Sequence, residues 1–416
     1  MSDLHQPEAI LAAATALLAR HFDTQIHLQP LDTFAASPNK QGSIVLRFQV
    51  SGSSALPPTV IVKQVRRDGG LKDGPYRPDH AEGPNIAFGF FNEWAALELL
   101  QQIGGKHPLG PALYAGDRDQ GLLIMEDLGK GFGGTPADIM ESADPEAGGQ
   151  ALLDYARAQG QLHALSAGHA DQFCRLREKL GPPPAPLPPC QDPWQDARRQ
   201  AIPDAEIAAL VQGYQNQCLA LSVTPQPGYE NEIWEAVQQV ENPPPAYLAL
   251  AQGDQNGLGG LLRSGPRLRF YDFDTAGFRH PLREGVPARI TWGAMLRVPR
   301  PWVGAMDQAY QRELARGIPA MAQDALFHRA IVEAGAHWNI FHVLERLPAG
   351  LEKDGPRGAS SFRTQVLGWL NGFADMAEEF DHFPALAQTT RLLVERLVNL
   401  WPPHVHTPPL WPPFRP

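Results

Sequence analysis

The chain is poor in cysteine, in long apolar runs and in positive charge. Its 416 residues include three cysteines, Cys174, Cys190 and Cys218, in no paired metal spacing, so we expect neither a disulfide framework nor a structural zinc site. No run of about 18 apolar residues occurs, so a membrane span is not expected. The N-terminus has no basic region before an apolar one, so a signal peptide is not expected either, and we predict a cytoplasmic protein.

The charge balance is acidic, with 35 Lys and Arg against 45 Asp and Glu and a formal net charge of -10. This balance opposes nucleic-acid binding through a diffuse basic surface and is compatible with neutral or cationic small substrates. A chain of 416 residues is long enough for two unequal lobes around a buried centre. We therefore expect a partner that is a small molecule, with no nucleic acid and no membrane.

Two acidic segments follow apolar runs in the second half of the chain. The run 247–251 predicts a buried strand that leads to Asp254, and residues 261–271 predict a hairpin that leads to Asp272. The hairpin would bring Asp272 close to Asp254, where the two carboxylates could face a metal or a proton in transfer. A solvated hairpin with acids at its ends explains the same residues, and both interpretations stay open at this point.

The first part of the chain predicts a small antiparallel sheet. Strands are predicted over residues 26–31, 43–50, 59–65 and 121–125. Lys63 lies inside the third of them, where a charge needs water or a partner, and an outward-facing lysine is the plain alternative. The next helix, predicted over Phe91–Ile103, carries Glu93 in its first turn and Glu98 further on. Either glutamate could pair with Lys63, although a first-turn carboxylate is also favourable by itself.

Met125, Glu126, Asp127 and Leu128 leave the last predicted strand and begin a connector. Backbone N–H and C=O groups exposed at such a point can pair with a flat nucleobase. Beyond the connector, apolar periodicity predicts helices over residues 151–167, 307–316, 325–347, 361–380 and 386–400. His163 lies near the end of the first of these helices and is interpreted as a core or capping residue without a chemical role.

In chain order, several of these residues resemble the aminoglycoside phosphotransferase and choline kinase-like superfamily of protein-kinase-like folds. They are Lys63, Glu93, Met125-Glu126-Asp127-Leu128, Gln252-Gly253-Asp254 and Asp272-Phe273-Asp274. The resemblance implies a two-lobed α+β fold. A small antiparallel β lobe with a leading helix would span residues 1–126 and bind the nucleotide. A larger, mainly helical lobe would span residues 127–416 and carry the catalytic loop and the substrate site.

The resemblance also implies a role for each residue. Lys63 would hold the α- and β-phosphates of ATP and Glu93 would brace it. The connector residues Met125, Glu126 and Leu128 would contact the nucleotide. Asp254 would orient or deprotonate the hydroxyl of a small-molecule substrate. Asp272 would bind Mg2+.

Two positions depart from the superfamily pattern, in which a histidine precedes the Gly-Asp pair and an asparagine follows the aspartate five positions later. Gln252 stands at the histidine position, and an amide can replace part of a histidine's hydrogen bonding. Gly259 stands at the asparagine position and offers no side-chain oxygen to a metal. Asn256 or Asp274 could serve as a metal ligand instead. Without a replacement one Mg2+ would be held weakly, so a nucleotide-binding pseudokinase is the first alternative.

The residues Asp272, Asp274 and Thr275 also resemble the Asp-x-Asp-x-Thr motif of haloacid-dehalogenase-like phosphatases. Such a motif should open a doubly wound α/β domain, whereas helices with few strand signals are predicted downstream of Asp274. We therefore predict an ATP-dependent phosphotransferase that acts on an alcohol group, with the pseudokinase and then the phosphatase as alternatives.

Overall fold

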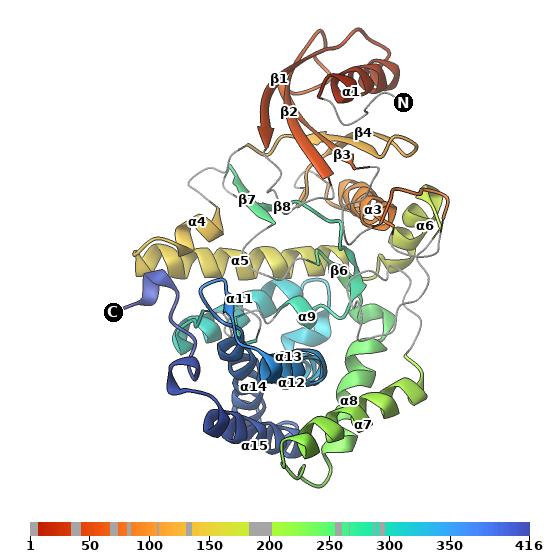
Figure 1. The fold of residues 1–416 in the computed structure, drawn as a ribbon. Coiled ribbons are helices and arrows are strands. Elements are labelled where there is room, and N and C mark those ends of the chain that lie inside the picture. The colour runs from red at the N-terminus through yellow and green to blue at the C-terminus, as the bar shows by residue number, and fades with distance from the viewer. Residues whose placement is uncertain are drawn as a thin grey trace.

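The computed structural model describes residues 7–34, 43–66, 74–80, 85–105, 108–129, 135–182, 202–253, 260–265, 267–285, 288–290 and 296–416. They form a β-rich lobe and a larger helical lobe, with the long helix α5 (Pro145–Ser166) running along the boundary between the two (Figure 1). The predicted two-lobed α+β fold is confirmed.

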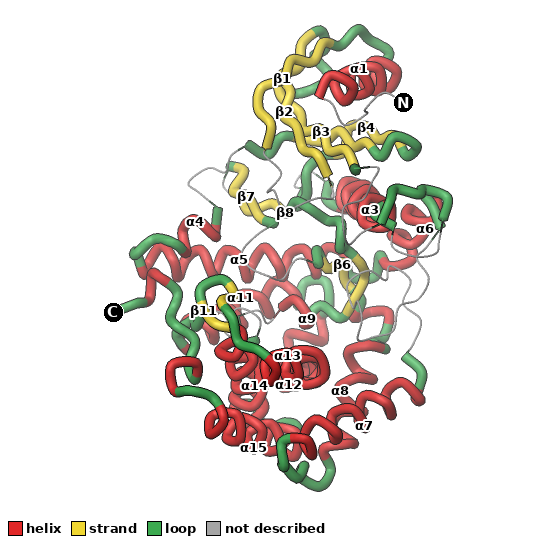
Figure 2. The backbone as a smooth tube through the Cα atoms, in the orientation of Figure 1, coloured by secondary structure: helices red, strands yellow, loops and turns green. Residues whose placement is uncertain are grey.

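The smaller lobe is built on a five-stranded antiparallel sheet of order β1-β2-β3-β5-β4 (Figure 2). Its strands are β1 (His27–Phe34), β2 (Ser43–Ser51), β3 (Thr59–Val65), β4 (Leu113–Asp117) and β5 (Leu122–Glu126). Successive side chains of a strand point to opposite faces. In β3, Val60 and Val62 therefore pack with α1 (Pro7–Phe22) in one hydrophobic core on one face of the sheet. Val65 packs on the other face into a second, larger hydrophobic core.

Helix α3 (Ala87–Ile103) contributes to the second core, and it begins earlier than the sequence analysis predicted. The side-chain oxygen of Asn85 accepts the N–H of Ala87 at 3.0 Å, and the buried Phe88 and Phe90 extend the apolar part of the helix toward its N-terminus. Glu93 consequently lies in the second turn. Its predicted first-turn position is wrong, and a favourable interaction with the helix dipole does not account for it.

The larger lobe is helical. Besides α5 it contains α4 (Pro136–Met140), α6 (Ala170–Leu180), α7 (Asp204–Ala220), α8 (Tyr229–Glu241), α9 (Leu282–Gly285), α11 (Arg300–Leu314), α12 (Asp324–Phe341), α13 (Leu347–Glu352), α14 (Phe362–Glu379) and α15 (Pro384–Leu400). A π-helical turn, His342–Arg346, joins α12 to α13, so the helix predicted over 325–347 is interrupted. No helix in the described part of the chain is long and apolar enough to cross a membrane.

Two short antiparallel ladders carry the acidic segments. Strand β6 (Ala249–Ala251) pairs with β9 (Gly277–Arg279), and β7 (Leu261–Ser264) pairs with β8 (Arg267–Phe270) as the predicted hairpin. A further short ladder joins β10 (Pro356–Arg357) to β11 (Ser360–Ser361). Every ladder between these named strands is antiparallel, so the described residues contain no doubly wound α/β domain of the kind that the phosphatase alternative requires.

Candidate functional site

Lys63, Glu93 and Asp272 come together where the sheet, α3 and the segment after β8 meet. The Nζ atom of Lys63 lies 2.6 Å from Glu93 Oε2 and 2.7 Å from Asp272 Oδ1. The Lys63 side chain is 11% exposed, that of Glu93 is 3% exposed, and that of Asp272 is 30% exposed. One ammonium group therefore joins two carboxylates, of which one is buried and one faces solvent.

The direction of Lys63 follows from the alternation along β3. Lys63 shares the face of Val65, toward the core that α3 helps to build, rather than the face of Val62. The interpretation of Lys63 as an outward-facing lysine is wrong, because the whole residue is 9% exposed. Glu98, the competing partner, instead accepts an exposed hydrogen bond from Gln102 at 3.3 Å.

The charges of this cluster explain its pKa directions. Burial by itself lowers the pKa of Lys63, but attraction to Asp272, Glu93 and Asp274 outweighs burial, so the pKa lies well above its usual value. Burial raises the pKa of Glu93 and Asp272 adds repulsion, whereas Lys63 opposes both, and the net direction is upward. The lysine is thus held as a fixed ammonium group.

The backbone of Asp272 adopts a left-handed conformation, with φ 62°, which is unfavourable for a residue other than glycine. Two contacts hold it there. Phe273 is fully buried beside it, and the side-chain amide of Gln252 donates to the main-chain oxygens of Tyr271 at 2.9 Å and Asp272 at 3.0 Å. Gln252, from the end of β6, therefore ties the segment that leads to Asp254 to the segment that carries Asp272.

The predicted catalytic loop lies outside the described residues, which end at Gly253 and resume at Gly260. The roles of Asp254 and Asn256, and the effect of Gly259, therefore stay predictions. The loop's beginning is described: Gly253 has φ 98°, a conformation that glycine tolerates, and a Cβ atom there would collide with the backbone and side chain of Thr275.

Glu284 of α9 binds the backbone just before that loop. Its Oε2 accepts the N–H of Gln252 at 3.1 Å and its Oε1 accepts the N–H of Gly253 at 2.7 Å. The residue is 3% exposed, and Gln159 donates a further hydrogen bond to it at 2.9 Å. Burial would raise the pKa of Glu284, but the hydrogen bond and charge of His163 and the further partners lower it. A buried carboxylate thus positions the start of the loop.

His163 extends this network, because its Nδ1 shares a hydrogen bond of 2.7 Å with the hydroxyl of Tyr310 while its Nε2 lies 3.6 Å from Glu284. It lies in the core, as expected. Sequence analysis missed Glu284, because a single glutamate in a short helix carries no local signal of which backbone it will reach. Its neighbour Arg283 is also buried, and only the fold shows where these two charges lie.

The connector residues lie at the end of β5. Met125 is 6% exposed and Leu128 is 9% exposed. Arg269 of β8 grips the Glu126 carboxylate at both oxygens, each at 2.7 Å, and the same carboxylate accepts the N–H of Ala112 at 3.0 Å. The N–H of Glu126 donates to Ala112 at 2.8 Å, so this N–H is already used within the protein. Any main-chain contact of Glu126 with a nucleobase would have to use its C=O group.

Asp272 and Asp274 match the ligand chemistry of Mg2+, which prefers oxygen ligands. The Asp272 side chain is part-exposed and Asp274 is exposed, so both carboxylates reach the surface on the side of Lys63. The main-chain oxygen of Asp274 lies 3.5 Å from the side-chain nitrogen of Asn92 in α3, which places this segment against the helix that carries Glu93. Asp272 and Asp274, and Asn256 by prediction, are therefore the candidate ligands.

Comparison with protein-family models found no match, and comparison with curated protein sequences found none either. The fold is similar to that of several solved structures. One is an amicoumacin kinase in complex with AMP-PNP and Ca2+ (12% identity, 98% of this chain, 96% of that chain, TM-score 0.43). A second is a macrolide 2′-phosphotransferase from Brachybacterium faecium (16% identity, 83% and 94%, TM-score 0.41). A third is a choline/ethanolamine kinase family protein from Mesorhizobium loti (14% identity, 88% and 92%, TM-score 0.37).

These neighbours are small-molecule kinases or phosphotransferases by name, and the likeness concerns the fold. The two-lobed architecture described above is the one that the resemblance to the aminoglycoside phosphotransferase and choline kinase-like superfamily implies.

Proposed function

We propose that the chain is an ATP-dependent phosphotransferase that transfers the γ-phosphate to a hydroxyl group of a small molecule. The observation that supports this most is the buried ammonium of Lys63, 2.6 Å from Glu93 and 2.7 Å from Asp272. Gln252 links this cluster to the backbone that leads into Asp254. A fixed cation beside two separate acidic segments is the arrangement that phosphoryl transfer uses.

Phosphoryl transfer depends mainly on positioning and on neutralising the charge that develops on the phosphate oxygens. Lys63 binds the nucleotide phosphates, and Glu93 keeps its ammonium in place. Asp272, with Asp274 or Asn256, would hold Mg2+, which when bound neutralises charge on those oxygens. Asp254 orients the substrate hydroxyl and accepts its proton. The hydroxyl oxygen forms a bond to the γ-phosphorus as the bond from that phosphorus to the ADP oxygen breaks.

ADP release in the presence of Mg2+-ATP and a library of small alcohols and amino sugars tests the proposal. We expect release with at least one acceptor, and we expect it to disappear in Asp254→Ala and in Asp272→Ala. Glu395→Ala, which removes an exposed carboxylate of α15, is the control that should retain activity. Turnover that survives both aspartate substitutions would refute the assigned roles.

A pseudokinase is the second candidate because Gly259 supplies no metal-binding side chain. It predicts ATP binding that needs little Mg2+ and no phosphate transfer to any acceptor. Thermal unfolding with ATP, measured with and without Mg2+, separates the two functions, since at a fixed concentration a ligand that binds the folded state more tightly stabilises it more. A large Mg2+-dependent increase in the effect of ATP favours the phosphotransferase, and equal effects favour the pseudokinase.

A further inference from the structure

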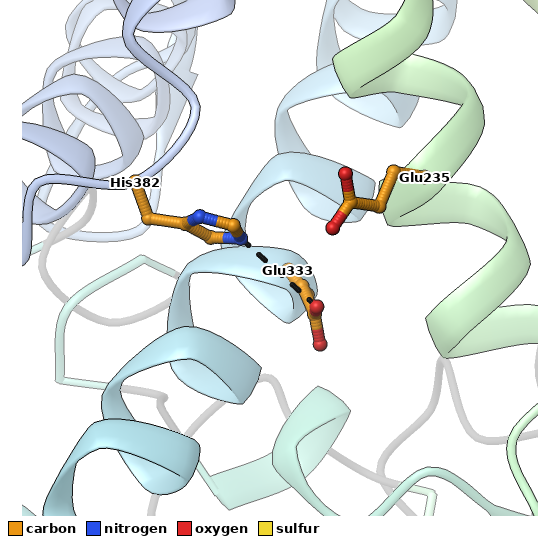
Figure 3. Close-up of side chains that lie close together, drawn as sticks. All are labelled: Glu235, Glu333 and His382. Atoms are coloured by element: carbon orange, nitrogen blue, oxygen red, sulfur yellow. Dashed lines mark ion pairs between the residues drawn. The ribbon is translucent and has the colours of Figure 1, made fainter.

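Glu235, Glu333 and His382 converge within the helical lobe, although they lie far apart in the sequence (Figure 3). Glu235 comes from α8, Glu333 from α12, and His382 from the turn between α14 and α15. One potential ligand atom of each residue lies within 4.8 Å of the others. None of these residues belongs to the cluster around Lys63.

The imidazole of His382 is held with its Nε2 atom directed at Glu333. That nitrogen is shielded from solvent and makes no hydrogen bond, because its distance of 4.0 Å to Glu333 Oε1 is too long for one. The ring stacks on Phe383 with centroids 4.0 Å apart. Asp381 and Phe383, on either side of it, both have left-handed backbones, with φ 48° and 58°. A buried ring nitrogen without a partner is unfavourable, and a bound cation would supply the missing partner.

The side chains that converge here fit a particular class of metal ion. A neutral imidazole offers a lone pair, and one imidazole nitrogen with two carboxylate oxygens is a ligand set that zinc accepts. Mg2+ prefers oxygen ligands alone. Zinc bonds to nitrogen and oxygen are about 2.0–2.2 Å long, so two ligands of one ion lie roughly 3.5 Å apart.

Arg329 holds the two carboxylates in the structure. Its Nη2 atom lies 2.6 Å from Glu235 Oε1, and its Nε atom lies 2.8 Å from Glu333 Oε1. Its side chain is 48% exposed, so the guanidinium group can turn into solvent without opening the fold. Glu235 is 41% exposed on its side chain and can move the short distance needed to bind an ion. Glu333, at 7% exposed, is the fixed carboxylate.

We propose that Glu235, Glu333 and His382 bind one divalent ion of the zinc class, which takes the place of Arg329 between the carboxylates. The ion links α8, α12 and the turn before α15, and it leaves a coordination position for water. The site contains no cysteine. The expectation that the chain has no structural zinc site was drawn from the spacing of its cysteines and therefore does not apply to this site. It is also independent of the proposed phosphotransfer, because it shares no residue with that site.

The test is a titration of the full-length, metal-stripped protein with Zn2+, measured by calorimetry, together with X-ray absorption at the zinc edge. We expect one ion per chain, bound by one imidazole and by oxygen, without sulfur. Glu235→Gln and His382→Ala should each weaken binding by at least about tenfold. Arg329→Gln should strengthen binding several-fold, because it removes the competing cation. His404→Ala, at an exposed histidine outside the cluster, is the matched control.

Zinc binding that is unchanged in Glu235→Gln and in His382→Ala would come from other groups and would overturn the proposal. Failure of Arg329→Gln to bind more tightly than the wild type would overturn the exchange with Arg329. If His382→Ala does not fold, Glu235→Gln carries the test, because it is a conservative change at a part-exposed side chain. Sulfur ligation, or more than one equivalent site, would equally count against this assignment.

Discussion

Replacement of Lys63 by methionine should destabilise the fold, because it leaves the buried carboxylate of Glu93 without its partner. Loss of one member of a buried ion pair costs about 3–5 kcal/mol. Two features place Lys63→Met near the lower value. The Asp272 side chain is 30% exposed, so its carboxylate stays hydrated when Lys63 is removed. The pKa of Glu93 is already raised, so its carboxylate can take up a proton. We therefore expect a loss of about 3 kcal/mol in the free energy of unfolding.

The double variant Lys63→Met/Glu93→Leu should recover most of that loss. Both buried charges are then replaced by apolar side chains of similar volume, a change that is often neutral. We expect a free energy of unfolding within about 1 kcal/mol of the wild type. Neither variant should bind ATP by calorimetry if Lys63 holds its phosphates, so stability and nucleotide binding are affected separately.

Urea unfolding followed by circular dichroism measures these changes as shifts in midpoint at constant m value. Lys179→Met, at an exposed lysine of α6, is the matched control and should stay within about 0.5 kcal/mol of the wild type. If Lys63→Met is as stable as this control, or if the double variant is no more stable than the single one, the inference that Lys63 and Glu93 form a buried pair is refuted.

Three further predictions concern the backbone around the predicted catalytic loop. Gly253→Ala should reduce ADP release strongly, because its new Cβ collides with Thr275, whereas Gly265→Ala, also at a positive φ (62°) but with open space around the new Cβ, should retain activity. Gln252→Leu should lower the free energy of unfolding by about 1–3 kcal/mol, measured in urea, because two main-chain oxygens lose their donor. The pKa of Glu284 is lowered in the fold, so its stabilisation is present above its ordinary pKa of 4.5 and is lost as the pH falls through the folded value. The stability difference between the wild type and Glu284→Gln should therefore shrink below about pH 4.5, and a constant difference in urea midpoint from pH 7 to pH 3 would contradict this.

Local periodicity predicted the longer elements of the first lobe and of the C-terminal half, because alternation and helical spacing record which side of an element is buried. It did not predict β4, β9 or the helices α6, α7 and α8. The strands β2 and β3 and the β7–β8 hairpin match the predicted segments to within a residue or two. The start of α3 was placed too late, since its apolar residues surround the helix and give no clear boundary. The interruption of the predicted 325–347 helix by a π-helical turn leaves no signal in a hydrophobic pattern.

The order of motifs along the chain was enough to predict that Glu93 would brace Lys63, and the structure places them 2.6 Å apart. The contact of Lys63 with Asp272, at 2.7 Å, was not predicted. The partners that hold this site could not be predicted in the same way. Arg269 and Glu284 make their contacts with segments distant in the sequence, and a charged residue on a strand or helix is usually solvated. Pairings of this kind depend on the three-dimensional fold.

The β7–β8 hairpin is bound to both lobes. From one face of the ladder Arg269 binds the Glu126 carboxylate where the sheet ends, and from the other face Arg263 binds Asp154 of α5 at 2.7 Å. Asp272 lies two residues after the end of β8. A change in the angle between the lobes must therefore either stretch one of the two guanidinium contacts or move Asp272 with the hairpin. The hairpin thereby links the angle between the lobes to the position of the acid that we propose as a metal ligand.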